Sequence, residues 1–277
     1  MLDITILGLN GVRQIEAPVE TMEAWGMIEP DGVYDVTRTY QAGGVLLLEE
    51  HLNRLDNSAR SEGIPVVYPR QRARAVVRAR LDEKGLGSSR LRFCIGRDKP
   101  EELIITLEEI GAGAQQLAGL KANGVHADLR TIARRNPAAK TNDWVRERNK
   151  LLAQEPTGCY ESLIVSGDGE LLEGFSSNFY AIRAGKMHAA EEGRVLSGLA
   201  RRVVFIVARS ICAVVESAIR VDEIELLDEA FLTSSGRGIV PITRIGEVIL
   251  GDGKPGPLTI QLMNAYDDWV VEHIEAL

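Results

Sequence analysis

Short β-branched and aromatic runs alternate with amphipathic helical patterns along the chain, and this alternation restricts the fold to the α/β and α+β classes. The first 110 residues predict strands at 33–40, 45–48, 90–96 and 102–108, and helices at 49–59 and 70–84. The remainder predicts strands at 120–126, 161–166, 177–183 and 229–233, and helices near 143–154, 198–212 and 257–275. These elements are enough to form two structural units, each with both strands and helices.

A small, uncharged, glycine-rich stretch at 111–119 separates the two sets of elements. This composition is typical of a crossing between domains. A chain of 277 residues is also long enough for one large domain or two modest ones. We therefore predict a small α+β domain at 1–112, an interdomain linker at 113–119 and a larger α/β domain at 120–277.

Composition excludes several classes of partner. The chain has 32 basic and 40 acidic residues, and its net charge of −8 disfavours nucleic acid or an anionic membrane as the main partner. Its start lacks a basic segment followed by an apolar one, and no run approaches a membrane span, so a cytoplasmic protein is expected.

Cys94, Cys159 and Cys212 are far apart and flanked by apolar residues, which predicts buried free thiols. The four histidines show no zinc spacing, so no metal site is expected.

Lys140 is the first candidate for a reactive group. Pro137 indicates an extended approach and residues 141–143 supply candidate helix caps, so Lys140 is expected on a short loop just before a helix. The positive end of that helix and partial desolvation would lower the pKa of the amine toward its neutral, nucleophilic form. Taken alone, however, a surface lysine beside a cap explains the pattern better.

Four further stretches each allow a chemical and a purely structural interpretation. Glu173, at the start of a run of glycine and small hydroxyls, could face a ring nitrogen or lie in an ordinary turn between strands. Residues 195–201 open a helix whose N–H groups could hold a phosphate or only water. The hydroxyls and N–H groups of residues 233–237 suit a phosphate or carboxylate, and also a common turn. Arg54 could grip a phosphate or remain a solvated helix residue.

Together and in this order, these motifs resemble a known family. They are Arg54 in His-Leu-Asn-Arg-Leu, Lys140 after Asn-Pro-Ala-Ala, Glu173-Gly174 followed by Asn178, Leu-Ser-Gly-Leu-Ala-Arg at 196–201, and Thr-Ser-Ser-Gly at 233–236 with Pro241 beyond it. The chain is thereby similar to the class IV, or fold-type IV, pyridoxal phosphate-dependent aminotransferases. This family includes branched-chain and D-amino acid aminotransferases, R-selective amine transaminases and the related aminodeoxychorismate lyase. Residues 31–36 are closest to the D-amino acid branch.

The resemblance implies a two-domain D-amino acid aminotransferase-like fold with pyridoxal 5'-phosphate between the domains. It implies that Lys140 forms the Schiff base with the cofactor and then moves the proton at the substrate α-carbon. Glu173 would meet the pyridine nitrogen and keep it protonated. The remaining cofactor-binding residues implied by the resemblance are Arg54, Asn178, the N–H groups of Leu199 and Ala200, and the Ser235 hydroxyl.

Substrate-binding residues are implied less uniformly. Tyr34 would line the substrate side, and Gly236 and Arg237 would border the substrate carboxylate. The Arg-x-His pair of D-amino acid enzymes is missing from residues 96–100, and Ala200 replaces the threonine usual in the phosphate motif. Three arginines are candidate carboxylate anchors: Arg38, where branched-chain enzymes place an arginine, and Arg90 and Arg92, which alternate with Leu91 and so share one strand face.

We therefore predict a transaminase that moves an amino group between a D-amino acid or branched-chain amino acid and a 2-oxo acid, in ping-pong half-reactions. The alternative is a lyase that releases pyruvate from aminodeoxychorismate. A third hypothesis is a non-catalytic α/β binding module. The resemblance also implies a homodimer, and it leaves the amino donor and its stereochemistry open.

Overall fold

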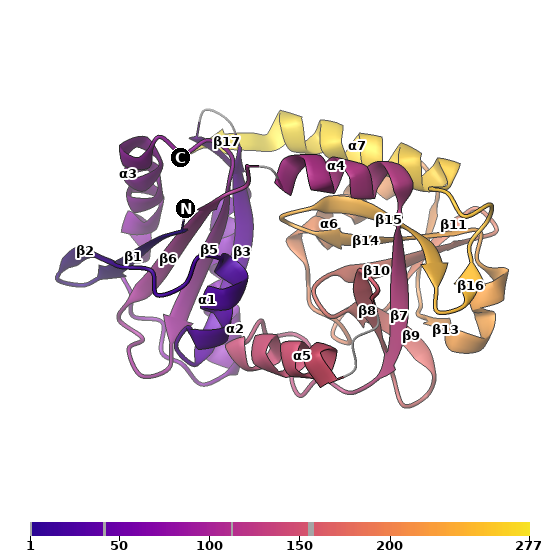
Figure 1. The fold of residues 1–277 in the computed structure, drawn as a ribbon, viewed down its shortest axis with the longest axis horizontal. Coiled ribbons are helices and arrows are strands. Elements are labelled where there is room, and N and C mark those ends of the chain that lie inside the picture. The colour runs from indigo at the N-terminus through magenta and orange to yellow at the C-terminus, as the bar shows by residue number, and fades with distance from the viewer. Residues whose placement is uncertain (1, 41–42, 112, 155–157) are drawn as a thin grey trace. The chain divides into compact units, whose positions relative to one another are not determined.

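The computed structural model describes residues 2–40, 43–111, 113–154 and 158–277 (Figure 1). The chain divides into two units. The first unit comprises Met1–Gly111, Ala139–Gln154 and His273–Leu277. The second comprises Ala112–Ala138 and Glu155–Glu272.

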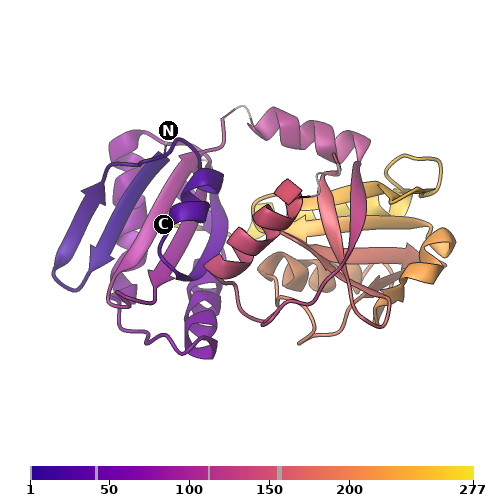
Figure 2. The same ribbon diagram turned by 60° about the horizontal axis from the view of Figure 1, so that its bottom comes forward.

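The sheet of the first unit is antiparallel and has the strand order β17-β4-β3-β5-β6-β1-β2. The β3–β4 hairpin and strands β5 and β6 confirm the sequence prediction, whereas β1 and β2 were not predicted. In Figure 2 the indigo β1–β2 hairpin forms one edge of this sheet. The strand bounds are β1 Leu2–Gly8, β2 Gly11–Ile15, β3 Gly32–Tyr40, β4 Gly44–Leu46, β5 Ser89–Gly96, β6 Leu103–Glu109 and β17 Ile274–Ala276.

Alternation along β3 sends its side chains into two different cores. Val33 joins a cluster with Leu52 and Leu55 of α2 (Leu48–Ser61) and Val77 of α3 (Ala73–Lys84). The predicted helices at 49–59 and 70–84 are thereby confirmed, although residues 70–72 form a short 3-10 helix (η2, Arg70–Arg72). Tyr34 points to the opposite face of the sheet, where it joins residues of two further helices. These helices are α1 (Met22–Ile28), which was not predicted, and α5 (Asn142–Gln154), which was.

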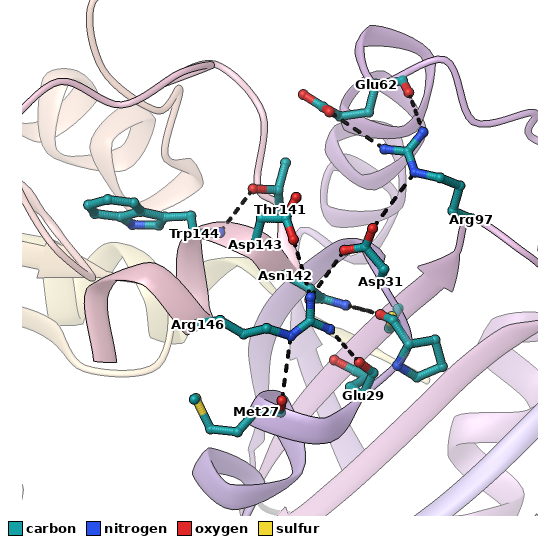
Figure 3. A network of polar contacts seen from close by, with 12 residues as sticks. Met27, Glu29, Asp31, Glu62, Arg97, Thr141, Asn142, Asp143, Trp144 and Arg146 are labelled. Atoms are coloured by element: carbon teal, nitrogen blue, oxygen red, sulfur yellow. Dashed lines mark hydrogen bonds and ion pairs between the residues drawn. The ribbon is translucent and has the colours of Figure 1, made fainter. Parts of the chain in front are cut away.

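The segment that carries Lys140 belongs to the first unit, which differs from the predicted domain ranges. Arg146 of α5 donates to the carbonyl oxygen of Glu29 over 2.7 Å and to Asp31 over 3.1 Å. Asn142 donates to the carbonyl oxygen of Pro30 over 2.7 Å (Figure 3). These partners lie more than 110 residues away along the chain, so no local pattern indicates them.

The strands of the second unit pair in the order β12-β11-β10-β14-β15-β7-β8-β9-β13, with β16 on β15. An additional pairing of β9 with β10 joins β10, β14, β15, β7, β8 and β9 into a closed ring around one apolar cluster. The strand bounds are β7 Val125–Thr131, β8 Glu161–Val165, β9 Glu170–Gly174, β10 Asn178–Arg183, β11 Lys186–Ala189, β12 Ala213–Glu216, β13 Ile219–Arg220, β14 Glu229–Ser234, β15 Gly238–Ile245 and β16 Val248–Ile249.

One helix of the second unit lies where the sequence predicted a linker. Residues 113–119, predicted as a linker, lie within α4 (Gly113–Asn123), and the strand expected at 120–126 begins at Val125. The physical reason is that Leu117 and Leu120 pack against the apolar cluster of the ring, which supports a helix despite its small residues. The other helices are α6 (Leu199–Ala208) and α7 (Pro257–His273), both close to prediction, and the 3-10 helix η3 (Val221–Leu226).

The three cysteines are free thiols, as predicted. Cys94 is buried, whereas Cys159 and Cys212 are only half-buried, so burial was predicted correctly for one of the three. Within the described ranges, no helix combines the length and the apolar character needed to cross a membrane.

Candidate functional site

Lys140 is held in place through its own backbone. Its N–H donates to Ser58 Oγ over 3.2 Å, and its carbonyl oxygen accepts from the N–H of Tyr34 over 2.9 Å. Thr141 Oγ1 caps α5 by accepting from the N–H of Trp144 over 3.3 Å. The predicted position of Lys140, on a short loop just before a capped helix, is therefore confirmed.

The amine of Lys140 lies over an aromatic ring, with Nζ 4.7 Å from the ring centroid of Tyr34. Burial lowers the pKa of Lys140 below its usual range, Tyr34 partly opposes this shift, and the positive charge of Arg54 adds to it. The direction matches the prediction, but desolvation is the main cause. A larger share of neutral amine makes Lys140 a better nucleophile.

Arg54 on α2 is oriented by a buried carboxylate. Its Nε and Nη2 donate to the two oxygens of Asp35 over 2.6 and 2.8 Å, and His51 Nδ1 lies 2.6 Å from the same carboxylate. Burial raises the pKa of Asp35, but the charge of Arg54 and the hydrogen bonds from His51 and Arg54 outweigh burial and hold this pKa well below its usual range. Burial lowers the pKa of His51, although Asp35 opposes this shift. The sequence did not identify Asp35 as the partner of Arg54.

Two of the three candidate carboxylate anchors are neutralised within the first unit. Arg92 donates through Nε and Nη2 to Glu29 over 2.8 and 2.5 Å, and its guanidinium lies 3.8 Å from the ring centroid of Tyr34. Arg90 pairs with Glu23 and, over 3.1 Å, with Glu108. A paired guanidinium is a weaker attractor for a substrate carboxylate than an unpaired one.

Arg38 differs from these two arginines. It lies directly across from Arg90 on the neighbouring strand, and its guanidinium is 4.9 Å from the ring centroid of Tyr40. Within the described residues Arg38 has no acidic partner, and its Nε is buried without an acceptor. Such a group gains most from an incoming anion, because it already bears the cost of burial.

In the second unit, Glu173 and Asn178 lie directly opposite each other at the point where the ring of strands closes. One oxygen of Glu173 accepts from Arg134, and the other accepts from the N–H of Leu196 over 3.0 Å. Thr233 lies across from Asn178 on β14, so three candidate polar residues lie in a row on adjacent strands. The sequence did not identify Arg134, which is 39 residues from Glu173.

The start of α6 has the features of an anion-binding helix terminus. Gly198 is the N-cap and supplies no side-chain hydrogen bond, so the first N–H groups, including those of Leu199 and Ala200, have no side-chain cap. Asn178 Nδ2 donates to the carbonyl oxygen of Leu196 over 2.9 Å. A Cβ at position 198 would lie 2.1 Å from Asn178 Oδ1, so this approach requires glycine.

Ser235, Gly236 and Arg237 form the loop between β14 and β15, and all three are half-buried. Arg237 does not extend from this loop as a free cation. Its Nε donates to Ser234 Oγ over 2.8 Å, Nη1 to Tyr160 Oη over 3.0 Å, and Nη2 to Ser176. All three guanidinium nitrogens are thus engaged within the second unit, which the sequence did not reveal.

These groups define a class of protein. The first unit contains an amine of lowered pKa beside a tyrosine, and the second contains a buried carboxylate paired with an arginine and a helix start without a side-chain cap. An amine of lowered pKa is a candidate nucleophile, so these groups favour an enzyme over a non-catalytic binding module.

Comparison with known proteins specifies the class further. The family model described as "Amino-transferase class IV" matches residues 32–245, and the chain belongs to this family. It is 25% identical over 263 residues to a branched-chain-amino-acid aminotransferase of Pseudomonas aeruginosa, covering 88% of this chain and 86% of that protein. It is 27% identical over 258 residues to a D-alanine aminotransferase of Bacillus licheniformis, covering 87% and 88%.

Solved structures show the same fold. A branched-chain amino acid aminotransferase of T.th., complexed with N-(5'-phosphopyridoxyl)-L-glutamate, matches with a TM-score of 0.81 at 20% identity and covers 98% of each chain. The branched-chain enzyme of Escherichia coli matches with a TM-score of 0.78 at 19% identity, covering 98% of this chain and 96% of that one. The predicted family and fold are confirmed. The chain is an aminotransferase, with amino acids and 2-oxo acids as substrates, and the lyase alternative is not favoured.

Proposed function

We propose that the chain binds pyridoxal 5'-phosphate and holds it covalently through Nζ of Lys140. The observation that carries this proposal is the lowered pKa of Lys140 at a backbone position fixed by Ser58 and Tyr34. Attack on an aldehyde requires the neutral amine, and a fixed backbone limits the positions that Nζ can reach. When bound, the cofactor supplies an electron sink for the bonds of the substrate α-carbon. Once the substrate amine has replaced Nζ on the cofactor, the freed amine of Lys140 would take and return the proton at that carbon.

We assign the ring nitrogen of the cofactor to Glu173. Arg134 pairs with Glu173, and a carboxylate that faces the ring nitrogen can hold a proton on it. The N–H of Leu196 on the other carboxylate oxygen fixes the orientation of the group. Asn178 supports the same segment by holding the carbonyl oxygen of Leu196.

The phosphate is assigned to donors of different kinds. The N–H groups at the start of α6 lack a side-chain cap, and the Ser235 hydroxyl lies in a short loop. Arg54 adds a guanidinium whose orientation is set by Asp35. Ala200 in place of a threonine removes one hydroxyl and leaves the backbone donors unchanged. Each of these groups is of a chemical kind that binds phosphate.

For the substrate carboxylate we choose Arg38 over Arg90 and Arg92. Both Arg90 and Arg92 already bind glutamates, whereas Arg38 has no acidic partner in the described chain. Tyr34 is buried beside Lys140 and is assigned to the substrate side, and the backbone of Gly236 to the carboxylate region. The substrate class is a D-amino acid or a branched-chain amino acid, by analogy with the named relatives.

The proposal includes a homodimer in the cytoplasm. The dimer rests on the family resemblance, and three free thiols agree with a reducing compartment. Light scattering on active protein tests the first part, because a monomeric mass would contradict it. Cell fractionation tests the second.

The spectrum of the cofactor tests the function itself. An amino donor alone should abolish the visible band of the lysine-bound cofactor, and a 2-oxo acid should restore it. Parallel runs with L-leucine, D-alanine and R-1-phenylethylamine assign the donor class. A protein that stays colourless when incubated with pyridoxal phosphate would refute the proposal, and pyruvate release without this cycle would restore the lyase alternative.

A further inference from the structure

A cluster of five polar residues lies in the second unit, and we name it the clamp cluster. Its members are Tyr160, Glu161, Ser176, Ser234 and Arg237. Arg237 donates to Ser234 Oγ over 2.8 Å, to Tyr160 Oη over 3.0 Å, and to Ser176 through the carbonyl oxygen over 3.1 Å and Oγ over 2.9 Å. Glu161 is buried, accepts from Ser176 Oγ over 2.7 Å and lies 3.9 Å from the Arg237 guanidinium.

The clamp cluster joins three segments that are distant in sequence. Glu161 begins β8, Ser176 lies in the turn between β9 and β10, and Ser234 ends β14. The turn that contains Ser176 connects Glu173 to Asn178, the pair that closes the ring of strands. The loop that contains Arg237 also contains Ser235 and Gly236. One guanidinium therefore connects the loop assigned to the phosphate with the turn beside the ring-nitrogen carboxylate.

We propose that Arg237 is a positioning residue that fixes the Ser235–Gly236 loop for cofactor binding, rather than an anchor for the substrate carboxylate. The proposal rests on the function proposed above. Its physical basis is the planar fork of arginine, which donates in three directions at once, whereas the ammonium of lysine is a single point. The buried carboxylate of Glu161 supplies the compensating negative charge.

A role as substrate anchor conflicts with the geometry. A substrate carboxylate would have to displace Tyr160 or Ser176 from the guanidinium, and it would approach within the field of the nearby Glu161. A positioning role requires no displacement, because each nitrogen of the fork already donates to a neighbour. The two roles differ in one measurable respect, since only positioning affects the cofactor when no substrate is present.

The test measures pyridoxal phosphate affinity of the apoprotein, by titration of the visible band, in parallel with KM and kcat. Arg237→Met should raise the dissociation constant of pyridoxal phosphate by roughly tenfold or more, since several charged hydrogen bonds are lost. Arg237→Lys should recover part of this loss. Tyr160→Phe and Ser176→Ala should shift the same constant less, in the same direction. Arg244→Met is the matched control, because Arg244 lies on β15 and pairs with the exposed Glu247, and it should leave the constant unchanged.

Several results would overturn the proposal. A raised KM with unchanged cofactor affinity in Arg237→Met would make Arg237 a substrate anchor. A lower melting temperature with unchanged cofactor affinity would leave it only a structural role. If Arg237→Met fails to fold, Tyr160→Phe and Ser176→Ala decide the question, and unchanged affinity in both refutes it. Wild-type protein that binds no pyridoxal phosphate would instead refute the proposed function.

Discussion

Glu29→Gln should destabilise the protein far more than removal of one surface carboxylate usually does. The Glu29 side chain is fully buried, and Arg92 is 5% exposed, with two hydrogen bonds of 2.8 and 2.5 Å between them. The substitution keeps the shape of the side chain, but its single carbonyl oxygen cannot accept from both Trp25 Nε1 and Arg92, and the buried guanidinium loses its counterion.

The size of the effect follows from what Arg92 retains. Removing one partner of a buried ion pair typically costs about 3–5 kcal/mol, and Arg92 keeps a 2.9 Å bond to Asn142 Oδ1 and its position over the Tyr34 ring. We therefore expect a loss near the lower end, about 3 kcal/mol in the free energy of unfolding. Replacing both residues together by leucine and methionine should cost less than Glu29→Gln alone.

Urea denaturation followed by tryptophan fluorescence measures this loss, and Trp25 reports directly because it donates to Glu29 over 3.2 Å. Glu102→Gln is the matched control. Its 2.9 Å pair with Arg13 joins the same residue types, but Arg13 is 51% exposed, so the cost should stay below about 1 kcal/mol. Equal losses in the two variants, or a loss below about 1 kcal/mol for Glu29→Gln, would refute the reasoning.

Three further variants or conditions test other parts of the site. Gly198→Ala places a Cβ 2.1 Å from Asn178 Oδ1, so it should raise the dissociation constant of pyridoxal phosphate, measured by titration, by about tenfold or more. An unchanged constant would contradict the assignment of the phosphate to the start of α6. Arg38→Met should raise KM for the amino acid at least about tenfold, whereas Arg90→Met should not. Buried His51 has a lowered pKa, so the unfolded chain binds a proton that the folded one does not. The urea midpoint should therefore fall as pH drops below about 6.5, and a flat profile would contradict this.

Local signals predicted much of the architecture. The position of Lys140 followed from Pro137 and the Thr141 cap, α2 followed from its helical spacing of apolar residues, and β3 followed from its β-branched and aromatic residues. Strands β1 and β2 were not predicted although they form a local hairpin, and the second partner of β1 is β6, about a hundred residues away. The small residues of α4 indicated a linker. The composition of this segment does not show that two of its leucines pack against an apolar cluster and so stabilise a helix.

The types of residue at the site were also predictable, but their partners were not. Glu173 was found from its motif, yet Arg134 is 39 residues away, and nothing in the spacing connects them. Arg92 was a candidate carboxylate anchor from its strand position, whereas Glu29, 63 residues earlier, neutralises it. Charge balance in a buried site is therefore a tertiary property.

The most direct test of the central claim is chemical trapping at Lys140. Holoprotein reduced with borohydride and digested should give one peptide that carries the phosphopyridoxyl group, and mass spectrometry should place the group on Nζ of Lys140. Lys140→Ala protein should show no such peptide and no transamination. A label on a different lysine, or undiminished turnover by Lys140→Ala, would contradict the account.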